Sequence, residues 1–116
     1  ENDIRKIHTY SQYLLNSTAM KEAAFLQEMH RRLLTAFREE ELPSMLQSIK
    51  TYYDCSRSVS CAAQKLYIHK NTLQYRVKRV QEALELTALP PFYQEYLIRL
   101  VIAHLHRKSG PQGLEK

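Results

Sequence analysis

The sequence predicts an all-α protein, a helix-turn-helix bundle of about six helices, on three observations. The chain has 116 residues, which is the size of one small domain. It contains only two glycines and four prolines, whereas all-β folds that are rich in turns usually have more. Between these helix breakers the apolar residues recur every three or four positions, as they do on one face of a helix.

Residues 1–41 are predicted to form an N-terminal helical extension, which serves as a linker or a dimerisation element. One helix is expected over about 3–16, and a second over about 19–40, after the capping residues Asn16, Ser17 and Thr18. The apolar stripe of the second helix is long for a core contact alone, so packing within the chain and a dimer interface both remain open. Its members are Met20, Ala23, Ala24, Leu26, Met29, Leu33, Leu34 and Phe37.

Residues 42–107 are predicted to be the main domain. Pro43 favours the first turn of a helix over about 43–53. Ser58 is then expected to cap a short helix that ends near Leu66. A turn of three residues leads into the next helix.

The second half of this domain is predicted to consist of two helices. The first runs over 70–84, with Leu73, Val77, Val80 and Leu84 facing the core. Pro90 and Pro91 open the second, which ends near His106. Its expected inner face is Tyr93, Leu97, Leu100, Val101, His104 and Leu105. Residues 108–116 lack periodicity and are expected to form a flexible tail.

The positive charge of the chain is concentrated in one segment. Residues 1–54 have seven basic and eight acidic side chains, and residues 82–116 have four of each. Residues 55–81 have six basic side chains and no acidic one, which accounts for the net charge of +5. A local basic excess on helical sequence is typical of an element that binds DNA.

The pattern over 58–84 predicts a helix-turn-helix. Ala62 and Ala63 are small residues where the second helix must approach closely, and Ile68 is an apolar residue within the turn. Because the second helix of such a motif enters the major groove by its N-terminal end, its polar face is expected to read DNA.

Each polar residue of this face has a predicted role. His69, Lys70, Asn71, Thr72 and Gln74 are expected to contact bases, since these side chains donate or accept hydrogen bonds at base edges. Lys65, Lys78 and Arg79 are expected to contact phosphates, as is Lys70 in addition to its base contact. Tyr75 completes the predicted DNA-binding set. His69 is equally suited to capping the helix, and Arg76 either contacts DNA or pairs with a carboxylate such as Glu82.

The string LYIHKNTLQYRVKRV resembles the C-terminal helix-turn-helix of the PucR family of bacterial transcription regulators, which includes sugar-diacid regulators. The family pattern of apolar, His, basic, Asn, Thr, apolar, Tyr and Arg falls on 66–77, and the resemblance extends over about 45–105. Ser58 and Lys70 stand where the family often has Asn and Arg. The resemblance implies a DNA-binding regulator that acts as a homodimer on double-stranded DNA in the cytoplasm, with any effector bound N-terminal to this chain.

Other chemistry is not indicated. Cys55 and Cys61 are expected to be reduced thiols rather than a disulfide. No metal, cofactor or enzymatic activity is expected, because the sequence has no cluster of ligands, no phosphate-binding loop and no paired carboxylates. No apolar run is long enough to cross a membrane. The alternative function is a helical protein-interaction module whose basic face meets an acidic partner.

Overall fold

The computed structural model of the protein describes residues 21–115, and the side chains of residues 21–107. Residues 21–36 are helical, and they are followed by α2 (Leu42–Asp54), α3 (Val59–Leu66), α4 (Lys70–Ala83), a 3-10 turn η1 (Leu86–Ala88) and α5 (Pro91–Glu115). The described part of the chain has no strand, so the predicted all-α fold is confirmed. The helix predicted over 3–16 and its capping residues lie outside the described residues.

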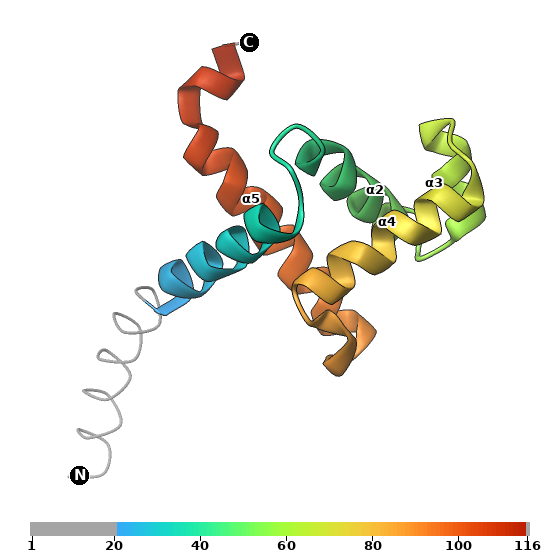
Figure 1. Ribbon diagram of the computed structural model, residues 1–116, viewed down its shortest axis with the longest axis horizontal. Helices are drawn as coiled ribbons and strands as arrows, with labels where there is room; N and C mark the ends of the chain where they lie inside the picture. Colours follow the sequence, from blue (N-terminus) through green and yellow to red (C-terminus); the bar gives the residue numbers. More distant parts are fainter. Residues whose placement is uncertain (1–20, 116) are drawn as a thin grey trace, which may run out of the picture.

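Helix α2 is the centre of the packing arrangement. It contacts α3, α4 and α5, while α3 and α4 also pack against each other. In Figure 1 α3 and the beginning of α4 form one end of the molecule, and α5 passes behind the helix over 21–36. The helix pair formed by α3 and α4 therefore projects from a base made by the other helices.

The core is a single apolar cluster to which every helix contributes. Leu33, Ile49, Leu73, Val80 and Ile98 are fully buried. Each predicted inner residue of α4 is buried, which confirms the face predicted from the spacing. The free energy gained by removing this apolar surface from water is the main force that holds the helices together.

The long stripe before α2 contributes to the core of its own chain. Leu26, Met29, Leu33 and Phe37 are buried, whereas Ala23, Ala24 and Leu34 are exposed. On the polar side of this helix, Arg31 and Arg32 both form ion pairs with Glu28. Together these two guanidinium groups lower the pKa of Glu28 to about 2, so this carboxyl stays ionised in mild acid.

Helix α5 differs from the prediction in its end and in its inner face. The helix continues to Glu115, beyond the end predicted near His106. Tyr93 is 56% exposed, although the spacing predicted it to face the core, and Ile98 is fully buried instead. The inner face is shifted because Gln94 is buried, where it donates to the Leu89 carbonyl at 2.8 Å and accepts from Gln81 of α4 at 3.2 Å.

The close approach of α3 depends on its two alanines. Ala62 and Ala63 are buried at the contact with the neighbouring helices. Replacing Ala62 by Leu should destabilise the protein by about 1–3 kcal/mol, because the added side chain has no space to fill. The measurement is the free energy of unfolding in urea. Ala103→Leu, at an exposed position of α5, is the matched control, and equal stability of the two variants would contradict this packing.

Candidate nucleic-acid interface

The turn between α3 and α4 is fixed by backbone hydrogen bonds. The amide of Tyr67 donates to the Gln64 carbonyl at 3.2 Å, and that of Ile68 donates to the Ala63 carbonyl at 3.0 Å. These two bonds form the Schellman motif that ends many helices. Ile68 is partly buried against the core, so the apolar residue in the turn holds the two helices together, as predicted.

Both helices of the motif begin with a side-chain cap. Ser58 Oγ accepts a hydrogen bond from the Cys61 amide at 3.1 Å, and His69 Nδ1 accepts one from the Asn71 amide at 3.1 Å. A ring nitrogen that accepts a hydrogen bond carries no proton, so Nδ1 of His69 is the unprotonated nitrogen. His69 is exposed, and within the described residues its Nε2 makes no hydrogen bond.

The predicted DNA-reading side chains form one exposed face. His69 and Lys70 begin it, and residues one helical turn apart continue it along α4. The exposed members of the predicted set are Lys65, His69, Lys70, Asn71, Thr72, Gln74, Tyr75 and Lys78. All of these side chains, which the sequence assigned to one site, are thus exposed on α3, on α4 or at the turn between them.

The basic residues of this face are not neutralised within the protein. The side chains of four of the six cations between residues 55 and 81 make no ion pair or hydrogen bond with any residue that the structure describes: Arg57, Lys65, Lys70 and Lys78. By contrast, the ion pairs of the described region join cations and acids elsewhere, such as Lys50 and Asp54 at 2.9 Å. The local excess of charge is therefore available to a polyanion.

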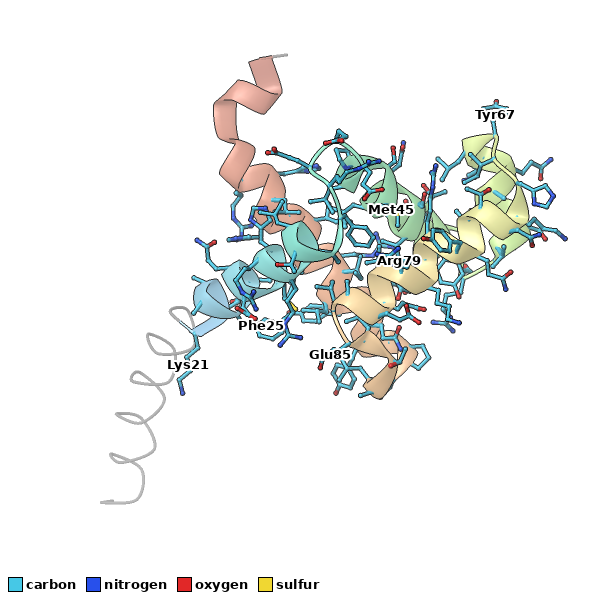
Figure 2. The ribbon with its side chains drawn as sticks, in the orientation of Figure 1. Lys21, Phe25, Met45, Tyr67, Arg79 and Glu85 are labelled. Carbon is cyan, nitrogen blue, oxygen red and sulfur yellow. The ribbon has the colours of Figure 1, made fainter. Side chains whose placement is uncertain are left out.

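Arg79 has a structural role that the sequence did not predict. Its guanidinium carbon lies 5.1 Å from the centre of the Phe37 ring and 5.7 Å from that of Tyr75. It donates hydrogen bonds to the Tyr75 hydroxyl at 2.8 Å and to the Ala36 carbonyl at 3.3 Å. Figure 2 shows Arg79 in the middle of the molecule, away from the end at which Tyr67 lies.

Arg76 is also held within the protein. Its Nη1 donates to Ser48 Oγ of α2 at 3.2 Å, and Ser48 is fully buried. Ser48 in turn donates to the Ser44 carbonyl at 2.8 Å. Arg76 therefore pairs with a hydroxyl group, and within the described part of the chain it has no carboxylate partner.

Tyr67 is a candidate interface residue that sequence reasoning missed. It is 93% exposed and projects from the tip of the motif (Figure 2). Its backbone is left-handed, with φ 57°, a conformation that costs residues other than glycine about 1–2 kcal/mol. Its residue type gave no signal in the sequence, because the exposure follows from the left-handed backbone at this position.

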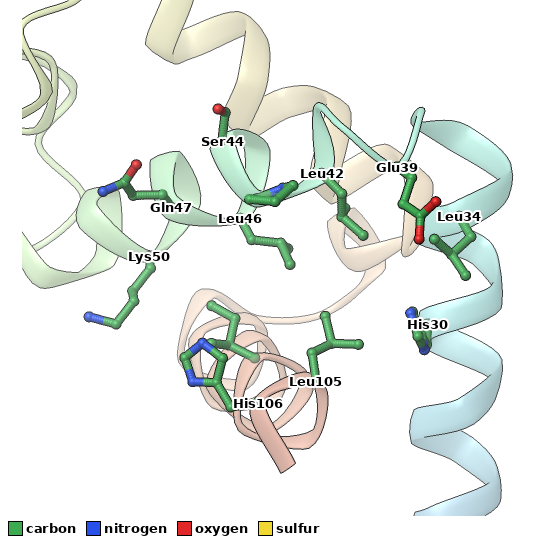
Figure 3. Close-up of a pocket in the computed structure, with 12 residues that line it drawn as sticks. His30, Leu34, Glu39, Leu42, Ser44, Leu46, Gln47, Lys50, Leu105 and His106 are labelled. Carbon is green, nitrogen blue, oxygen red and sulfur yellow. The ribbon is translucent and has the colours of Figure 1, made fainter. Parts of the chain in front are cut away.

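A separate cavity lies on the other side of α2. Its volume is about 770 Å³, and it lies between the helix over 21–36, α2 and α5 (Figure 3). His30, Glu39, Lys50 and His106 are its titratable lining residues, and no hydrogen bond joins any two of them.

The described residues contain neither a metal-binding cluster nor a membrane-spanning helix. No group of three or more His, Cys, Asp or Glu side chains between residues 21 and 115 could hold a metal ion. Within the same range no helix is both long enough and apolar enough to span a membrane.

A short helix, a tight turn and a second helix with one buried and one exposed face define a helix-turn-helix domain, the class of DNA-binding element found in transcription regulators. Residues 45–91 match the model of the PucR C-terminal helix-turn-helix domain, which confirms the resemblance in the sequence for this segment. The matched segment runs from the first turn of α2 to the first residue of α5 and includes every predicted DNA-binding residue.

The chain is also similar to curated proteins of two mycobacteria. Uncharacterized proteins of Mycobacterium bovis and of Mycobacterium tuberculosis are each 35% identical to it over 40 residues. The matched part is 34% of this chain but only 10% of each relative, so these relatives are much longer proteins. No solved structure matches the chain.

The capping role of His69 can be separated from any role of its ring in binding. His69→Ala should lower the free energy of unfolding by about 1 kcal/mol, because the Asn71 amide loses its acceptor. His69→Asn should retain most of the stability, because asparagine is a good N-cap residue. Thermal or urea unfolding measures both changes, and equal losses in the two variants would mean that the cap is not the source of stability.

Proposed function

We propose that this chain is the sequence-specific DNA-binding domain of a bacterial transcription regulator, and that α4 lies in the major groove. The observation that carries the proposal is the exposed face of α3 and α4, on which the side chains of Lys65, Lys70 and Lys78 are unpaired among the described residues and no carboxylate occurs between residues 55 and 81. Binding of phosphates to such a face costs little free energy, because the lysine side chains have no internal ion pairs to break first.

The N-terminal turn of α4 is the proposed base-reading element. Asn71 and Gln74 lie one turn apart on the exposed side, and their amide groups suit the two hydrogen-bonding positions of adenine. Lys70 suits guanine, and Thr72 suits a phosphate or the methyl group of thymine. His69 keeps Nε2 for a base while Nδ1 caps the helix.

Phosphate contacts are proposed on both sides of these residues. Lys65 lies in the last turn of α3, and Lys78 lies two turns after the beginning of α4. Tyr75 is 57% exposed, and its hydroxyl accepts from Arg79, which leaves its own hydrogen free for a phosphate. In this proposal Arg79 positions the Tyr75 hydroxyl by its hydrogen bond and does not itself contact DNA.

Two copies of the protein are proposed to bind paired half-sites. Helix-turn-helix proteins commonly act as dimers, because one recognition helix reads only a few base pairs. Phe25 and Leu34 are exposed apolar residues on the helix over 21–36, and they offer part of a surface for association. Any effector would be bound by a region outside this chain, and a cytoplasmic location follows from a role on bacterial DNA.

A protein-interaction module with a basic face is the alternative, and competition separates it from the proposal. Fluorescence anisotropy of the purified chain is measured on duplex DNA from upstream of its own gene and on scrambled duplex. The regulator proposal is supported if the chain binds the upstream duplex preferentially and if random duplex displaces it only weakly. The absence of binding to either duplex at low salt would overturn the proposal.

Lys78 should contribute affinity without sequence preference. Lys78→Ala should weaken binding to specific and random DNA alike, and it should reduce the slope of log K against log salt by about 0.9. The slope is measured by anisotropy at several salt concentrations. Lys21→Ala is the matched control, since Lys21 is exposed at the opposite end of the described molecule and should leave the slope unchanged (Figure 2).

Asn71 and Gln74 should contribute sequence preference. Replacing either by Ala should cost about 1–3 kcal/mol of binding free energy on the specific site and little on random DNA. The comparison requires a set of duplexes in which each base pair is changed in turn. A variant that loses the same affinity on every duplex would show that the residue does not read a base.

A further inference from the structure

The two cysteines of the chain meet at the corner between α2 and α3. Cys55 follows the last residue of α2, and Cys61 lies in the first turn of α3. The Cys61 thiol donates to Cys55 Sγ with a sulfur-to-sulfur distance of 2.8 Å. A disulfide bond is about 2.05 Å long, so less than about 1 Å of movement separates the thiols from bonding distance.

The backbone around the pair is firmly held. Ser56 and Arg57 both have positive φ, at 56° and 64°, and the Arg57 amide donates to the Tyr52 carbonyl at 2.8 Å. The Ser58 amide donates to the carbonyl of Cys55 at 3.1 Å, and Ser58 Oγ accepts from the Cys61 amide. These hydrogen bonds hold the backbone of the corner in a conformation that places the two sulfur atoms in contact.

The two thiols differ in access to solvent. Cys55 is buried, with 9% of its surface exposed, whereas Cys61 is partly exposed. The contact with Cys61, together with burial, raises the pKa of the Cys55 thiol. A reagent from solution therefore meets Cys61 first, and Cys55 follows as the second thiol of the pair.

We propose that Cys55 and Cys61 are a dithiol site at which a small disulfide forms a reversible cross-link between α2 and α3. The sequence predicted two reduced thiols rather than a disulfide, and both cysteines are free in the structure. The contact between the sulfur atoms adds that the two thiols can react with each other. The cross-link spans the corner that fixes the first helix of the motif on its supporting helix.

The reaction is a two-step thiol–disulfide exchange. The thiolate of Cys61, after loss of its proton to solvent, attacks one sulfur of the small disulfide and releases one thiolate, which leaves a mixed disulfide on Cys61. Cys55 then loses its proton and attacks the sulfur of Cys61, which releases the second small thiolate. The protein loses two electrons and two protons, and the small disulfide is reduced to two thiols.

Oxidised glutathione is the probe for this site. The folded chain is incubated with it, quenched with acid and analysed by mass spectrometry without reductant, with a sample reduced by dithiothreitol as the reference. We expect a monomer that is lighter by two hydrogen atoms and carries no glutathione. We also expect its thermal unfolding midpoint to rise by more than about 4 °C, since a cross-link restricts the unfolded chain.

Two single variants test the order of attack. Cys55→Ser should stop at a stable glutathione adduct on Cys61, because the second thiol is missing. Cys61→Ser should leave Cys55 unmodified while the protein is folded, because Cys55 is buried. Circular dichroism of each variant checks that the helices are retained.

Three results with the wild-type chain would overturn the proposal, and none depends on the variants folding. They are two free thiols after an incubation that fully oxidises a reference dithiol, a glutathione adduct that persists, and a cross-link between two chains. An internal disulfide that leaves the unfolding midpoint unchanged would also overturn it, because the corner would then not be stabilised.

Discussion

The structure depends on burying one face of α4 while leaving the other in water. Leu73, Val77 and Val80 fill the core beside α2, and this contact determines the rotation of α4 about its own axis. Once the rotation is set, Asn71 and Gln74 can only lie on the outside. The stability of the domain and the position of its proposed base-reading side chains thus arise from the same apolar contact, and neither can be altered without the other.

Much of this arrangement could be predicted from residue spacing, because an amphipathic helix records its buried face in its sequence. The inner face of α4, the cap at Ser58 and the turn at Ile68 are confirmed in this way. The face of α5 could not be predicted from spacing alone. Gln94 is polar, and its burial depends on the Leu89 carbonyl and on Gln81 of another helix, which are contacts between distant positions.

The residues of the candidate site could be predicted from the sequence, but which of them are exposed and which are held within the protein could not. Charge and polarity placed Lys65, Lys78 and Arg79 in one group, yet the structure separates them. The guanidinium of Arg79 lies against Phe37 and bonds to Ala36, residues more than 40 positions earlier in the chain. Nothing in the local sequence records such a partner. Tyr67 shows the converse case, because its backbone conformation, not its residue type, places it at the tip.

The bonds of Arg79 have a mechanical consequence. One guanidinium group holds the carbonyl of Ala36, at the end of the helix over 21–36, and the hydroxyl of Tyr75 on α4. A second link joins Arg32 of the same helix to Glu85, which lies just beyond the end of α4, at 3.3 Å. The helix over 21–36 is therefore attached at two points, to α4 itself and to the residue that precedes η1. Any shift of that helix would move the carbonyl that holds Arg79, and Arg79 holds the Tyr75 hydroxyl on the exposed side of α4.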